Sequence, residues 1–285
     1  MSREKIQFLF KDKELRKKIF IVLFLFVIFR ITANIPIPGV GVENLRRFFD
    51  QNQVFGLLNI FSGGALSNFS IALMGLGPYI TATIILQLLT MIFPALEKMY
   101  KEEGEAGRQK FNQYARLATI PLAAFEGYGF LTLFQRQGAI DPMPPLLLIG
   151  SIITIIAGAM FLMWLGELIS EQGMGNGISL LIFAGIVAQL PTSIFQTFVA
   201  WDPSRIPSYL VFFVLALVII AGVVLITEAR RNIPVSYSKR VRGNKMYGGV
   251  STYLPLSVNP AGVIPIIFAI SILLLPSMIA GFFSG

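Results

Sequence analysis

Seven stretches of mostly apolar residues dominate the chain, and each is close to the roughly 20 residues that a helix needs to cross the hydrocarbon core of a bilayer. They lie at residues 19–35, 73–93, 115–134, 145–166, 177–200, 208–227 and 260–283. Only 13% of the 285 residues are charged, whereas a soluble domain carries about 25%. The sequence therefore predicts an all-α membrane protein, a bundle of several spanning helices.

The positive charges fall mainly on alternate connections between these stretches. Seven Lys and Arg residues precede the first stretch, five lie at 94–116 and six at 228–258, against five on the other side or at its interface. Because Lys and Arg are retained in the cytoplasm, we expect the N-terminus and both basic connections to be cytoplasmic. The apolar run behind the basic tail has no small-residue cleavage site, so we expect it to remain as the first span.

Residue types that carry most catalytic chemistry are missing. The chain has no cysteine and no histidine, which removes thiolate nucleophiles, the commonest metal ligand and the usual general base. The GMGNG run at 173–177 does not complete a phosphate-cradling motif. A secondary transporter also contains broken helices, but Glu126 is the one acid deep in an expected span, so paired carboxylates for ion coupling are lacking. We expect no cofactor, no metal and no enzymatic activity.

The stretch from Asn59 to Gln87 is apolar but interrupted by glycine, serine, asparagine and proline. A helix over 78–93 would be only about 24 Å long at 1.5 Å per residue. One interpretation is that the residues before it fold back into the membrane from the outer side, where irregular backbone needs protein or a water-filled cavity around it. The other is that Gly63-Gly64 forms a turn outside the membrane, and spacing alone does not decide between them.

Two pairs of aliphatic residues have helical spacing. Leu76 and Ile80 are four residues apart, as are Ile178 and Ile182, so each pair shares a helix face. Such pairs from two helices can form a constriction that blocks ions by dewetting. Lipid-facing side chains show the same spacing, and the pattern alone favours lipid.

Glu126 lies near the middle of the third expected span, where a carboxyl group is costly to bury. Thr81, Gln87 and Asn259 are neutral polar residues of other spans that could share a polar patch with it. A protonated Glu126 in a helix-packing interface explains the residue equally well. For Arg30 we expect a side chain that extends toward the outer interface.

The connection 228–258 is basic, aromatic and longer than a connector requires. Its alternating VSYSKRV portion predicts a short hairpin that projects into the cytoplasm. Such a projection can dock on anionic lipid, RNA or an acidic protein surface. The residues expected to dock are Arg230, Arg231, Lys239, Arg240, Arg242 and Lys245.

Six motifs, in order along the chain, resemble the SecY family, the pore subunit of the bacterial general protein translocase. They are RITANIPIPGV, NIFSGGALSNFSI, PYITATIILQLL, EGEAGRQKFNQYAR, GAMFLMWLGELISEQGMGNGISLLIFAGIV and STYLPLSVNPAGVIPIIFA. The resemblance runs through the whole chain. It implies a channel that passes unfolded secretory polypeptides across the bacterial cytoplasmic membrane and releases membrane helices sideways into it.

The resemblance also implies roles for particular residues. The pore ring would comprise Leu76, Ile80, Ile178, Ile182 and Ile267. The plug, a short segment that seals the pore from outside, would comprise Asn59, Ile60, Phe61, Ser62, Gly63, Gly64, Ala65, Leu66, Ser67 and Asn68. Spans two and seven would border a lateral gate whose polar cluster comprises Thr81, Gln87, Glu126 and Asn259.

SecY proteins have ten spans in two inverted halves, and seven of them match this chain. Residues 1–200 would form the N-terminal half with five spans and the plug, and residues 201–285 would begin the C-terminal half with spans six and seven around the loop 228–258. The expected partners are the SecE and SecG subunits, the SecA motor or the ribosome at the cytoplasmic loops, signal sequences, the nascent polypeptide and anionic lipids.

Overall fold

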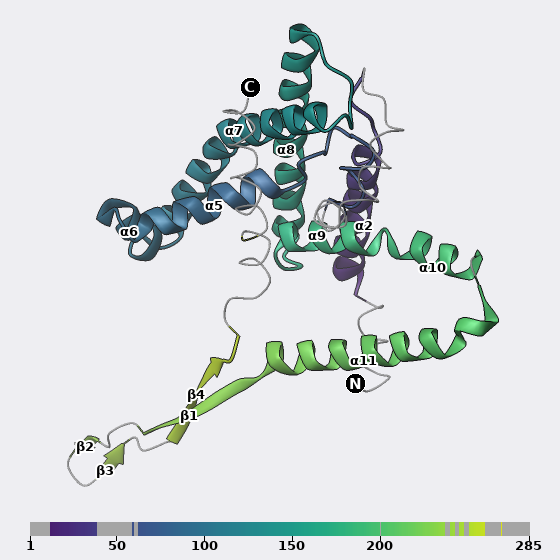
Figure 1. Ribbon diagram of the computed structural model, residues 1–285. Coiled ribbons are helices and arrows are strands. Elements are labelled where there is room, and N and C mark those ends of the chain that lie inside the picture. Colours follow the sequence, from purple (N-terminus) through teal and green to yellow (C-terminus); the bar gives the residue numbers. More distant parts are fainter. Residues whose placement is uncertain are drawn as a thin grey trace. The chain divides into compact units, whose positions relative to one another are not determined.

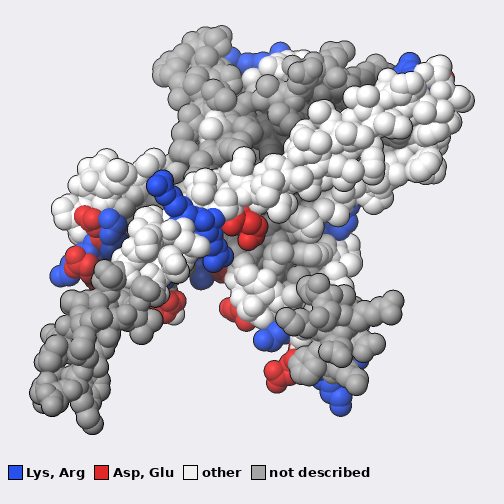
Figure 2. All heavy atoms as spheres, turned by 90° about the horizontal axis from the view of Figure 1, so that it is seen from below, with Lys and Arg blue, Asp and Glu red and all other residues white. Residues whose placement is uncertain are grey.

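The computed structural model describes residues 12–38, 59, 62–199, 201–236, 240–242, 245–247, 251–259 and 269. The chain divides into two compact units, one of residues 1–196 with 268–285 and one of residues 197–267. Both consist mainly of helices (Figure 1). Most of the described surface in Figure 2 is uncharged, as expected for a chain that faces lipid.

The first unit is built around helix α8 (Pro145–Glu171). Four other helices pack against it: α2 (Lys13–Thr32), α5 (Gly77–Thr90), α7 (Gly104–Arg136) and α9 (Gly177–Val187). Helix α6 (Pro94–Lys101) packs on α7. Figure 1 shows α8 in the middle of this group.

Glycines of α8 allow two neighbours to approach it closely. A Cβ on Gly158 would overlap the backbone carbonyl oxygen of Ile71, and Gly166 lies against Ile178 at the start of α9. Gly177 in turn touches the backbone of α8 at Gly166. Small residues at such contacts let membrane helices pack backbone to backbone, which is their main source of association energy.

The second unit contains the end of helix α10 (Leu190–Val199), the short 3₁₀ turn η1 (Pro203–Arg205), helix α11 (Ile206–Glu228) and two strand pairs. Helix α11 is apolar along its length, and none of its residues is buried. A helix that is apolar on all sides and uncovered by protein is suited to contact with lipid.

The strand pairs follow directly. Strands β1 (Arg230–Ser236) and β4 (Ser251–Ser257) are antiparallel, with Arg230 opposite Ser257 and Ser236 opposite Ser251. Strands β2 (Arg240–Arg242) and β3 (Lys245–Tyr247) form a second antiparallel pair. The connection therefore contains paired strands, but the VSYSKRV portion is not itself a hairpin, because its ends belong to β1 and β2, which pair with β4 and β3.

Among the described residues, four stretches are long and apolar enough to cross a membrane: α7, α8, α11 with η1, and Gly177–Gln196, which runs through α9 into α10. The pair α5 and α6 forms a fifth candidate that bends by 110°. These five correspond to expected spans two to six. The first expected span, 19–35, overlaps α2, which begins earlier, at Lys13. The helix begins there because Asp12 caps its N-terminus, where the Asp12 side chain accepts a hydrogen bond from the backbone N–H of Glu14. The seventh expected span, 260–283, lies outside the described residues apart from residue 269.

Two expectations about element boundaries were wrong. Residues 94–116 are helical rather than a loop, because α6 occupies Pro94–Lys101 and α7 begins at Gly104. The fifth span is interrupted between Val187 and Leu190. Pro191 lacks an N–H and its ring crowds the carbonyl of residue 187, so the helix cannot continue regularly at that point.

Candidate pore, plug and gate

The segments before and after the expected plug are joined by backbone hydrogen bonds. The N–H of Ile37 donates to the carbonyl of Phe69 at 2.8 Å, and the N–H of Ile71 donates to that of Ile35 at 2.9 Å. Phe69 is fully buried and has a φ of 45°, a conformation that is strained for an aromatic residue. This pairing closes the base of the plug loop and fixes where α5 begins.

The plug residues form a series of turns that are closed by their own polar groups. The carbonyl of Asn59 accepts hydrogen bonds from the N–H of Gly64 at 2.8 Å and the hydroxyl of Ser62 at 3.0 Å. The side-chain oxygen of Asn59 accepts one from the N–H of Ser67 at 2.9 Å. Gly63 and Gly64 both have positive φ, which glycine adopts without strain. Ile60 and Phe61 lie outside the described residues.

The plug packs inside the helical unit. Leu66 belongs to a buried apolar cluster that includes Phe69, Phe134 and Ile155. At the other end of the loop, a Cβ on Gly63 would lie 3.0 Å from the Cα of Gly185 in α9. The interpretation that places residues 62–68 against protein is therefore favoured over an exposed turn.

Two polar side chains reach the plug backbone from other elements. Arg30 of α2 is partly buried, and its Nη1 donates to the carbonyl of Gly63. Gln189, in the break between α9 and α10, donates from Nε2 to the carbonyl of Asn59 at 3.1 Å. The guanidinium of Arg30 thus binds a main-chain carbonyl of the expected plug, and its extension toward the outer interface stays a prediction. Gln189 was not among the residues predicted from the sequence.

The expected ring residues that the structure describes lie at the start of α5 and in α9, close in the chain to residues that contact the plug. Leu76 and Ile80 are buried at the start of α5, with exposed fractions of 8% and 9%. Ile178 and Ile182 of α9 are partly buried. By comparison, Phe183 on another face of α9 is 58% exposed. Ile267 lies outside the described residues.

The plug touches both helix regions that carry these aliphatic residues. Gly185, which meets Gly63, is three residues after Ile182 and so shares its face of α9. Ser62 lies 3.8 Å from the Cβ position of Gly75, directly before Leu76. Both helices also pack on α8, and Ile178 packs against the cluster that contains Tyr79. The structure thus brings the plug segment and these two aliphatic pairs into one region.

Within the first unit, Thr81 and Glu126 are brought together, whereas Gln87 is not. Both side chains are buried between α5 and α7. The Thr81 hydroxyl is the group that faces the Glu126 carboxyl, although it makes no hydrogen bond of normal geometry. Gln87 is exposed at the far end of α5, and Asn259 is exposed in the second unit.

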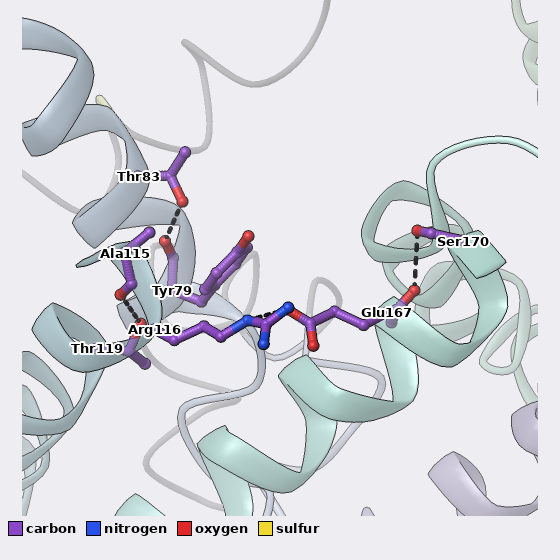
Figure 3. Close-up of polar contacts among 8 residues, drawn as sticks. Tyr79, Thr83, Ala115, Arg116, Thr119, Glu167 and Ser170 are labelled. Carbon is purple, nitrogen blue, oxygen red and sulfur yellow. Dashed lines mark hydrogen bonds and ion pairs between the residues drawn. The ribbon is translucent and has the colours of Figure 1, made fainter. Parts of the chain in front are cut away.

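An ion pair joins α7 to α8 close to this region (Figure 3). The Nε of Arg116 lies 2.6 Å from Oε1 of Glu167. Tyr79 of α5 packs beside it, against Ala115 and Met163. This ion pair was not predicted from the sequence. A signal was available, since Arg116 and Glu167 stand at the expected cytoplasmic ends of neighbouring spans, but pairing between helices cannot be inferred without their packing.

The expected docking residues fall on the strand pairs. Arg230 and Arg231 lie in β1 and are exposed. Arg240 and Arg242 lie in β2, and Lys245 lies in β3. Lys239 lies outside the described residues.

Curated relatives match nearly the whole chain. The chain is 44% identical over 283 residues to a protein translocase subunit SecY of Corynebacterium glutamicum, covering 95% of this chain and 63% of that protein. It is 46% identical over 261 residues to the protein of the same name from Pseudomonas aeruginosa, covering 90% of this chain and 59% of that protein. The chain therefore spans about six tenths of the length of these relatives.

Solved channel structures share the fold. One, described as showing that "the plug domain of the SecY protein" stabilises the closed state of the translocation channel, aligns with a TM-score of 0.62 at 21% identity, covering 92% of this chain and 56% of that one. Sec61 in a canine ribosome-channel complex aligns with a TM-score of 0.55 at 20% identity, covering 88% of this chain and 55% of that one. The family model SecY matches residues 70–285. Together with the curated relatives, this match establishes that the chain belongs to the SecY family.

Proposed function

We propose that the chain contributes the plug, most of the pore ring and one border of the lateral gate to a channel for unfolded secretory polypeptides and membrane helices. The observation that carries the proposal is the contact of Ser62 and Gly63 with the two regions that hold the aliphatic pairs, next to Leu76 and on the Ile182 face of α9. A segment in this position can seal a pore at the aliphatic ring. No covalent step is required of any residue.

The ring would exclude ions by its chemistry. The side chains of Leu76, Ile80, Ile178 and Ile182 offer no polar atom to replace the hydration shell of an ion, so a narrow ring of them stays dry. An unfolded polypeptide can pass because aliphatic side chains can rotate aside for it. Ile267, the fifth expected member of the ring, lies outside the described residues.

The lateral gate would lie between α5 and the expected seventh span. A signal sequence shifts the closed-to-open balance only if it binds the open form better. The buried contact of Thr81 with Glu126 lies on one side of this gate, between α5 and α7, and would stabilise the closed form by holding α5 in place. Interhelical polar contacts in membranes contribute about 0.6–2 kcal/mol each, which leaves the gate closed but easily opened.

Glu126→Leu should lower the signal-sequence threshold of the full-length channel. Loss of the buried carboxyl removes a polar contact of the closed gate, so precursors with defective signal sequences should be exported about three- to thirtyfold better. Glu126→Gln, which keeps size and hydrogen-bonding capacity, is the matched control. The measurement is the ratio of defective to intact precursor exported. Equal export of defective precursors by the leucine variant and the parent protein would refute the gate assignment.

The strand pairs of the second unit would dock a cytoplasmic partner, either the SecA motor or a ribosome. Arg230 and Arg231 are exposed and present positive charge on β1, and the basic residues Arg240, Arg242 and Lys245 belong to β2 and β3. The N-terminus would lie on the same cytoplasmic side. The similar fold of a channel solved in a ribosome complex supports a ribosome as one candidate.

Charge reversal on β1 should weaken this docking. Arg230→Glu with Arg231→Glu should reduce the affinity for SecA or the ribosome by about tenfold at low salt, and the difference should shrink as salt screens the charges. Arg205→Glu, at a cation of η1 that pairs with Asp202, is the control. The check is a binding titration at several salt concentrations, and unaltered affinity at low salt would remove the docking role.

The proposed channel function is tested with the full-length protein and its SecE and SecG partners in proteoliposomes. With SecA, ATP and a labelled secretory precursor outside, the precursor should become protected from added protease. Absence of protected precursor, combined with flux of a small solute driven by an ion gradient, would contradict the channel and indicate a secondary transporter.

A further inference from the structure

Two long polar side chains, from separate elements, bind the backbone of the plug. Arg30 of α2 donates to the carbonyl of Gly63, and Gln189 donates to the carbonyl of Asn59. A third contact, from the side-chain amide of Asn68 to the side-chain oxygen of Asn34 at 3.1 Å, lies at the exposed edge. These bonds join the plug to both flanking elements, α2 and the end of α9.

Partial burial of the charged Arg30 side chain costs free energy. Arg30 is the one charged residue in the last turn of α2, it is partly buried, and its neighbour Phe29 is buried beside Gly63. A cation in such a place is expensive unless its donors are satisfied. The Gly63 carbonyl satisfies one of them, so the guanidinium and the plug backbone stabilise each other.

Gln189 contacts the plug at the point where the fifth span is broken. Pro191 interrupts the helix after Val187, and Gln189 lies in the break, next to the Cβ position of Gly64 at 3.5 Å. The break in the span and the contact with the plug therefore fall at the same point of the chain.

Both bonds end on main-chain carbonyls. The Asn59 carbonyl also accepts from Ser62 and Gly64 within the plug, so Gln189 binds a point at which the loop is already closed on itself. Holding the plug by its backbone makes the attachment independent of the plug's side chains. It also places both bonds beside the Gly63–Gly185 contact, where the plug must separate from α9 to open the pore.

We propose that Arg30 and Gln189 are positioning residues that latch the plug in its closed seat and thereby set how often the resting channel opens. This inference rests on the proposed channel function and adds to it the residues that hold the seal. Loss of either donor leaves a plug carbonyl without that partner. Because a hydrogen bond to a charged group is stronger than a neutral one, the loss of Arg30 should have the larger effect.

The test uses the full-length complex in membranes and exploits the lack of cysteine in this part of the protein, with any cysteine elsewhere replaced. Ser67→Cys places one thiol on the plug, and a membrane-impermeant maleimide is added from the outer side to the resting channel. Arg30→Met and Gln189→Leu should each raise the labelling rate, by about tenfold for Arg30→Met. Arg30→Lys, which keeps a cationic donor, should restore most of the slow labelling.

Matched controls remove the same functional groups elsewhere. Arg205→Met removes a cation that binds Asp202, and Gln196→Leu removes an exposed amide on α10. Neither should change the labelling rate. Wild-type labelling rates in both Arg30→Met and Gln189→Leu would overturn the latch, as would an Arg30→Lys variant that labels as fast as Arg30→Met.

Failure of the latch is distinguishable from failure of the channel. The same membranes are assayed for protease-protected precursor. If the parent protein exports precursor and the variants label slowly, only the latch is wrong. If the parent protein exports no precursor, the proposed function itself fails.

Discussion

Gly158→Ala is expected to destabilise the full-length protein by about 1–3 kcal/mol or more, since an added methyl group in a tightly packed contact forces the surrounding structure to shift. At this position the methyl would overlap the carbonyl oxygen of Ile71, and a backbone carbonyl cannot rotate away as a side chain can. The displaced segment leads directly into Leu76 and Ile80. The same substitution should therefore also disturb the ring.

Gly150→Ala is the matched control for this effect. Gly150 lies in the same helix, α8, and a Cβ there would meet nothing within 4 Å. Because alanine is the better helix former by about 0.5–1 kcal/mol, this variant should be as stable as the parent or more so. Denaturant unfolding in detergent compares the two, and equal stability of both variants would show that α8 and residue 71 are not in close contact.

Ile80→Ser and Ile182→Ser are expected to make the resting full-length channel leak ions. Each serine removes apolar surface and adds a hydroxyl at the constriction, which lowers the cost of wetting it. A decrease of about 1.4 kcal/mol in that cost corresponds to a tenfold change, so we expect a steady conductance at least about tenfold higher in planar bilayers. The double variant should leak more than either single one.

The control for the leak is a substitution on the same helices outside the ring. Ile85→Ser on α5 and Phe183→Ser on α9 alter side chains that are 37% and 58% exposed. Both should leave the conductance at its resting level. A conductance that is unchanged in all four variants would count against a ring made of these residues.

The sequence predicted the helical class and most spans because hydrophobic length is a direct physical requirement of the bilayer. The prediction failed at residues 94–116, where the high content of charged residues was interpreted as a sign of a loop. Charged residues such as Glu105 and Lys110 are compatible with a helix that extends beyond the membrane, and α7 begins at Gly104, before the expected span. Hydropathy alone cannot separate a helix that emerges from the bilayer from a loop.

The site was predictable in part for a related reason. Glu126 stood out because a buried acid in a span is costly, and the structure places Thr81 against it. The contacts of Arg30 and Gln189 were not predictable, because their acceptors are main-chain carbonyls, which leave no mark in the sequence. Only the packing of α2, the plug and the broken fifth span brings those donors to their acceptors.

The most direct test of the pore is photocrosslinking with a secretory chain stalled during export through the full-length channel. A crosslinker is placed at position 80, 182, 85 or 183, and adducts to the mature part of the stalled chain are measured. The pore account predicts adducts from positions 80 and 182 and few from the exposed positions 85 and 183. Equal adducts from all four positions, or adducts from 85 and 183 alone, would contradict a path through this ring.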